Sequence, residues 1–196
     1  MSNQNQVSLE GTAEETPAPS HENHGVRFFR FLLNVPRLSG QRDTIPILAA
    51  EETAAQVHPG DLLRIQGQFR SFNNRSGVGS RLVLAVYARS VLPGLGVPCN
   101  EIFLSGTLCK PPVYRRTPLG RSICDLMLAV PRRYGRADYL PVIAWGQLAG
   151  RTAALGVGDP LALEGRIQSR VYHKTEGGET RERVAYEVSM MRMTEA

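Results

Sequence analysis

Residues 100–108 read NEIFLSGTL, and residues 5–12 read NQVSLEGT. The two segments lie 95 positions apart, and the same offset superimposes glycines and prolines that punctuate both stretches: Gly25 on Gly120, Pro36 on Pro131, Gly40 on Gly135 and Pro46 on Pro141. Further along the chain the offset becomes 98, which places Gly60-Asp61 on Gly158-Asp159. A long period repeated only twice indicates tandem domains rather than a solenoid.

The two copies are joined by LPGLGVPC at residues 92–99, which contains two prolines and two glycines and is typical of a short linker. We therefore predict three parts. Residues 1–91 form a degenerate N-terminal domain, residues 92–99 form the linker, and residues 100–196 form the C-terminal domain.

Apolar and alternating segments predict the same order of elements in both copies. In the second copy we expect strands at residues 102–108, 121–130, 139–145, 159–172 and 183–191, a helix at 147–155 and a hairpin turn at 176–179. In the first copy we expect strands at residues 7–12, 26–35, 44–49, 61–72 and 81–91, a helix at 51–57, a polar loop at 14–25 and a hairpin loop at 73–80. This order is that of the oligonucleotide/oligosaccharide-binding (OB) fold. The fold class predicted is all-β: two tandem five-stranded OB-fold barrels, each with one short helix.

Composition excludes several classes of protein. The 196 residues are 42% hydrophobic and 21% charged, as in ordinary globular domains. No apolar run is long enough for a membrane span, and no signal peptide is visible. Three cysteines without CxxC spacing predict reduced thiols in a cytoplasmic protein. No Walker, GxSxG or HExxH motif occurs, and His21 and His24 lack further ligands, so we expect no enzyme, no cofactor and no metal.

The formal net charge is +5, and 21 of the 23 basic residues are arginines. Arginine presents a planar fork that binds phosphate and stacks on bases, whereas lysine offers only a point charge. Two explanations stay open: an anionic partner, or a GC-rich coding bias towards arginine.

The second copy resembles the bacterial single-stranded DNA-binding protein family. The resemblance rests on NEIFLSGTL at 100–108, PPVYRRTPLGRSICDLMLAV at 111–130, RADYLPVIAWGQLAG at 136–150 and LGVGDPLALEGRIQSRVY at 155–172. Tandem-barrel members of the family are the nearest match. The resemblance implies a single-stranded DNA partner, a homodimer with four OB-folds and association with the nucleoid. Because no acidic C-terminal tail is visible, the recruitment of replication enzymes stays open.

The resemblance also implies base-stacking aromatic residues at Tyr134, Tyr139, Trp145 and Tyr172. Tyr139 and Trp145 lie six apart on one predicted strand, so they face the same side. The alternative is that one or two of these rings fill the core. Basic residues interleaved with the rings predict a phosphate track: Arg115, Arg116, Arg121, Arg132, Arg133, Arg136, Arg166, Arg170 and Lys174.

The first copy has no rings at the equivalent positions, where Thr44, Ala50 and Asn74 stand. Its phenylalanines alternate in a way that predicts core positions: Phe28, Phe29, Phe31, Phe69 and Phe72. We therefore expect the first copy to be mainly a structural and pairing partner, with backbone contacts to nucleic acid through Arg37, Arg42, Arg70 and Arg75.

Together these features predict a non-enzymatic protein that coats single-stranded DNA during replication, recombination or repair, with little sequence preference. Two alternatives stay open. The chain could bind RNA, because stacking alone distinguishes the two sugars poorly. It could also be an OB-fold protein-interaction module of a replication or primosome complex, because a fold does not by itself determine a function.

Overall fold

The computed structural model describes residues 4–74 and 81–194 and confirms an all-β fold with few helices. The N-terminal half contains β1 (Asn5–Ala13), β2 (Ala18–Asn23), β3 (Val26–Pro36), β4 (Arg42–Ala50), α1 (Glu51–Ala54), β5 (Leu62–Asn73) and β6 (Leu82–Pro93). The hairpin loop predicted at residues 73–80 lies mostly outside the described residues, and so does Arg75.

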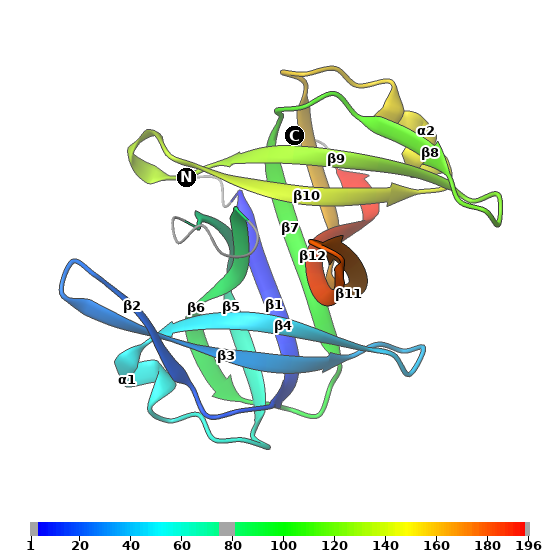
Figure 1. Cartoon of the computed structure of the whole chain (residues 1–196). Helices are drawn as coiled ribbons and strands as arrows, with labels where there is room; N and C mark the ends of the chain where they lie inside the picture. Colours follow the sequence, from blue (N-terminus) through cyan, green and yellow to red (C-terminus); the bar gives the residue numbers. More distant parts are fainter. Residues whose placement is uncertain (1–3, 75–80, 195–196) are drawn as a thin grey trace.

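The C-terminal half repeats this order (Figure 1). It contains β7 (Cys99–Leu108), β8 (Val113–Arg116), β9 (Ser122–Pro131), the 3-10 turn η1 (Arg133–Gly135), β10 (Ala137–Trp145), α2 (Gln147–Ala153), β11 (Pro160–Glu176) and β12 (Glu179–Thr194). The predicted turn at 176–179 is confirmed: Glu176 pairs with Glu179, and the glycines between them have positive φ.

The polar loop predicted at residues 14–25 is wrong, because β2 occupies half of it and pairs with β3. Every residue of β2 is exposed, so it has no buried face and no alternation that would reveal a strand. Its turn to β3 places His24 at φ 49 and Gly25 at φ 76, the positive dihedral angles that two-residue hairpins favour. The equivalent strand β8 was missed for the same reason, since it too is wholly exposed.

All strands belong to one twelve-stranded sheet, in which β1 and β7 pair antiparallel and join the halves. Figure 1 shows these two strands side by side in the middle of the molecule. In the N-terminal half the pairings run β1–β3–β4–β6–β5 and return to β1. In the C-terminal half they run β7–β9–β10–β12–β11 and return to β7.

Each half has a dense apolar interior. Phe31 and Phe69 are fully buried in the first half, as are Leu104 and Leu128 in the second. The register of β11 against β12 shifts between Glu164 and Gly165, so the long strand is interrupted at this glycine. A side chain here would clash, since an added Cβ would lie 2.3 Å from the carbonyl oxygen of Ser189.

Reciprocal hydrogen bonds tie the two halves together. The Asp43 carboxylate accepts the backbone N–H of Ser169 at 2.9 Å, and the Asp138 carboxylate accepts that of Ser71 at 2.9 Å. Asp43 and Asp138 are 95 residues apart, and Ser71 and Ser169 are 98 apart, the offsets seen in the sequence. The halves are therefore related by an internal pseudo-two-fold arrangement. No helix in the described part of the chain is long and apolar enough to span a membrane.

Candidate nucleic-acid interface

The outward face of β10 carries two of the predicted stacking rings. Leu140 and Ala144 are buried in the core, whereas the alternate positions Tyr139 and Trp145 are 48% and 37% exposed. Alternation along a strand puts these two rings on one face of the sheet. The structure thus places both rings on the outer surface rather than in the core.

Tyr134 and Tyr172 lie apart from that pair. Tyr134 stands in the turn between β9 and β10 and is 94% exposed, with φ at 63° in the left-handed region. For a bulky residue this backbone conformation is uncommon and carries strain. Tyr172 is partly exposed on β11, and the guanidinium carbon of Arg170 lies 5.8 Å from its ring centroid.

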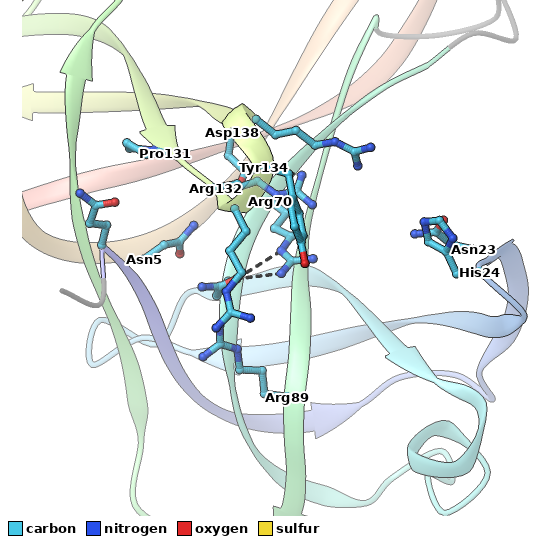
Figure 2. Close-up of a pocket in the computed structure, with 13 residues that line it drawn as sticks. Asn5, Asn23, His24, Arg70, Arg89, Pro131, Arg132, Tyr134 and Asp138 are labelled. Atoms are coloured by element: carbon cyan, nitrogen blue, oxygen red, sulfur yellow. Dashed lines mark hydrogen bonds and ion pairs between the residues drawn. The ribbon is translucent and has the colours of Figure 1, made fainter. Parts of the chain in front are cut away.

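A cleft of about 930 Å³ opens beside Tyr134, between the two halves of the chain (Figure 2). Its lining includes five arginines: Arg70 and Arg89 from the N-terminal half, and Arg132, Arg133 and Arg136 from the C-terminal half. Among the described residues that line it, Asp138 is the one carboxylate. This excess of positive charge makes the cleft suited to an anion such as a phosphate.

The charges at the base of the cleft influence one another. Arg70 is partly buried and donates to the side-chain oxygen of Gln68 at 2.9 Å, and burial together with the nearby Arg132 charge lowers its pKa. Asp138 is 1% exposed, and burial raises the pKa of its carboxyl group. Its Oδ1 lies 3.3 Å from Nη1 of Arg132. One buried carboxylate therefore faces several arginines, and much of their charge is left for a ligand.

The other predicted basic residues are more dispersed, and several are already in ion pairs. Arg115 pairs with Asp125 at 2.6 Å, and Lys174 pairs with Glu176 at 2.5 Å. Arg170 lies 3.6 Å from Glu187. Of the remainder, Arg116 and Arg121 are exposed at β8 and the turn that follows, and Arg166 is half-buried on β11. The structure therefore groups Arg132, Arg133 and Arg136 with Tyr134, and spreads the rest over the outer face.

The N-terminal half differs from the expectation in two respects. Phe31 and Phe69 are core residues as predicted, and Phe29 packs against the core. Phe28 is buried but lies outside the core cluster, and Phe72 is partly exposed. The sequence analysis also missed Arg89, which lines the cleft from β6. Its position was visible only as one outward residue near the end of a strand, which by itself gives no signal for a cleft.

The pseudo-two-fold partner of the cleft has a different composition. By the 95-residue offset, Arg133, Tyr134 and Arg136 correspond to Leu38, Ser39 and Gln41. Arg132 corresponds to Arg37, whose guanidinium is held in two hydrogen bonds by Asp43 at 2.7 and 2.6 Å. The arginine-rich cleft therefore occurs on one side of the pseudo-two-fold arrangement. Within residues 4–74 and 81–194, no group of three His, Cys, Asp or Glu side chains is placed to hold a metal ion.

Residues 99–194 match the model of the Single-strand binding protein family. The match covers the half that carries Tyr134, Tyr139, Trp145 and Tyr172. A single-stranded DNA-binding protein of Clostridium tetani is 36% identical over 85 residues, which are 40% of this chain and 59% of that protein. One of Thermus thermophilus is 37% identical over 89 residues, which are 43% of this chain and 34% of that protein. The chain thus spans 59% or less of the length of these two relatives.

Solved structures extend the similarity to the N-terminal half. The wild-type single-stranded DNA binding protein from Thermus aquaticus superimposes with a TM-score of 0.78 at 24% identity, covering 98% of this chain and 92% of that one. A deletion mutant of the same protein gives a TM-score of 0.75 at 25% identity, covering 98% of this chain and 94% of that one. The fold of both halves is therefore that of a known single-stranded DNA-binding protein.

Proposed function

We propose that this chain binds single-stranded DNA with little sequence preference. Bases would stack on Tyr134, Tyr139, Trp145 and Tyr172, and arginines would contact the phosphates. The observation that carries the proposal is the cleft lined by five arginines, with the exposed ring of Tyr134 beside it. An unpaired strand offers both the base faces and the phosphates that such a surface can engage, whereas a duplex hides its base faces.

The phosphate track of this proposal has two parts. The first is the cleft itself, with Arg132, Arg133 and Arg136. The second is formed by the remaining predicted basic residues: Arg115, Arg116, Arg121, Arg166, Arg170 and Lys174. Those in ion pairs would have to exchange a carboxylate for a phosphate, so we expect the cleft arginines to contribute more.

We further propose that each half is a five-stranded OB-fold barrel, with domain limits at residues 1–91 and 100–196. The strand pairings that return to β1 and to β7 support this. Two chains pairing would give four such barrels, in a protein that protects single strands during replication, recombination or repair.

The test is a titration with oligo-dT, which carries no sequence information. Trp145 is the one tryptophan of the chain, so a base stacked on it should quench the intrinsic fluorescence. Replacing it, Trp145→Ala, should weaken binding of a labelled oligonucleotide by about 1–3 kcal/mol, or roughly five- to 150-fold. Leu95→Ala, at an exposed apolar linker residue, is the matched control and should bind as the wild type does. Unchanged fluorescence at saturating DNA, together with unchanged affinity of Trp145→Ala, would exclude stacking at this ring. Competition with an RNA of matched sequence measures the preference for DNA.

A further inference from the structure

The outward face of the N-terminal half carries an aromatic cluster of four side chains from four strands: His21 on β2, Phe28 on β3, Phe72 on β5 and Tyr87 on β6. The His21 ring stacks on Phe28, with centroids 5.0 Å apart and planes 13° apart. Phe72 lies 6.3 Å from His21, and Tyr87 lies 5.8 Å from Phe28, both measured between centroids. The cluster is thus continuous across the sheet.

This face corresponds to the face that carries Tyr139 and Trp145 in the other half. On β4 the equivalent outward positions are Thr44 and Ala50, which have no rings. The N-terminal half therefore has aromatic side chains on the same face, but they come from the strands on either side of β4. A comparison position by position along the repeat cannot detect this replacement.

The cluster is open to solvent at its outer edge. Phe28 is 9% exposed and forms its base, whereas His21 is exposed and Phe72 and Tyr87 are partly exposed. Here a histidine ring is outermost, and the guanidinium carbon of Arg70 lies 4.0 Å from the centroid of the Tyr87 ring.

The cluster adjoins the arginine-rich cleft. Arg70 belongs to both, because it stacks on Tyr87 and also lines the cleft. Arg89 follows Tyr87 by two residues on β6, at the point where the register of β6 against β5 shifts, and it too lines the cleft. At the other edge His24, three residues from His21, lines the cleft from the turn after β2. A DNA strand that leaves the cleft on this side would meet the rings of the aromatic cluster directly.

We propose that the outward face of the N-terminal half is a second single-strand binding surface, on which His21, Phe72 and Tyr87 stack with bases while Arg70 and Arg89 hold the phosphates of nucleotides that leave the cleft. The proposal rests on the function proposed above. It goes beyond the expectation that the N-terminal half is mainly a structural and pairing partner, with backbone contacts to nucleic acid through Arg37, Arg42, Arg70 and Arg75.

The test uses the full chain with His21→Ala and Tyr87→Leu combined, since leucine keeps an apolar side chain over Phe28. A short oligo-dT of about eight nucleotides and a long one of about 35 are compared, because single OB-folds occupy roughly 4–16 nucleotides. We expect at least about a fivefold loss of affinity for the long oligonucleotide, the lower limit for one lost stacked base, and no change for the short one. His58→Ala, at another exposed histidine, is the control and should lose nothing.

Quenching of Trp145 by the short oligonucleotide separates the two proposals. If quenching occurs but the double variant binds the long oligonucleotide as tightly as the wild type, the second surface is refuted while the proposed function stands. If the wild type shows neither quenching nor binding, the proposed function itself fails. Equal losses for both lengths also refute the second surface, because they place the effect elsewhere. Thermal melts of all variants verify that the fold is retained.

Discussion

The arginines at the rim of the cleft should determine how strongly salt weakens DNA binding. Arg133 and Arg136 are both exposed, and neither is in an ion pair within the described part of the chain. A protein that neutralises phosphates of a single strand loses affinity with a slope of about 0.7 in log K against log salt for each contact. Replacing both, Arg133→Gln and Arg136→Gln, should therefore reduce the slope by about 1.4.

The size of the effect allows a clear measurement. When the salt concentration rises fourfold, from about 50 to about 200 mM, a slope difference of 1.4 reduces the ratio of wild-type to variant affinity about sevenfold. Fluorescence anisotropy of labelled oligo-dT at several NaCl concentrations gives both slopes. Arg192→Gln is the control, because Arg192 is held by Glu164 at 2.6 Å and lies outside the cleft. A double variant whose slope equals that of the wild type would refute the assignment of these arginines to phosphates.

Two further predictions concern stability. Asp43→Ala should lower the free energy of unfolding, measured in urea, by about 3–5 kcal/mol. Asp43 is fully buried, and its loss leaves Arg37 and the Ser169 N–H without the carboxylate that accepts their hydrogen bonds. A decrease in the free energy of unfolding below about 1 kcal/mol would contradict this. Glu10 accepts the backbone N–H groups of Leu95 and Val97 in the linker, and these hydrogen bonds lower its pKa below the ordinary 4.5. Its ionised form therefore stabilises the fold above pH 4.5, and that contribution is lost as the pH falls through the lowered pKa. Glu10→Gln lacks this contribution at every pH. Its melting temperature, followed by circular dichroism, should therefore fall less steeply on acidification than that of the wild type.

Much of the fold was visible in the sequence because it depends on local signals. Alternating apolar residues marked the strands with one buried face, and the 95- and 98-residue offsets showed that the two halves share one order of elements. Strands β2 and β8 left no such signal, because both of their faces are in solvent.

The candidate site was predictable in part. Tyr134, Arg132, Arg133 and Arg136 are close in the sequence, so their grouping could be expected. Arg70 was expected to contact nucleic acid, but its grouping with the C-terminal arginines could not be predicted, and neither could the contribution of Arg89. Both depend on the pairing of β1 with β7, which brings distant segments to one cleft. The aromatic cluster of the N-terminal half was missed for a related reason. The alternation of Phe28 and Phe72 fits either face of a strand, and only the pairing shows which face is inside.

Because the arginine-rich cleft occurs on one side of the pseudo-two-fold arrangement, it affects the direction in which a DNA strand would lie on the molecule. Two identical modules related by a true symmetry axis would offer a ligand the same groove twice, in opposite directions. Here Arg133 and Tyr134 on one side correspond to Leu38 and Ser39 on the other, so the two grooves are chemically distinct. Because the modules are joined in one polypeptide, their equivalent residues can differ, and we expect a bound strand to take one preferred polarity, with its 5′ and 3′ ends in different surroundings.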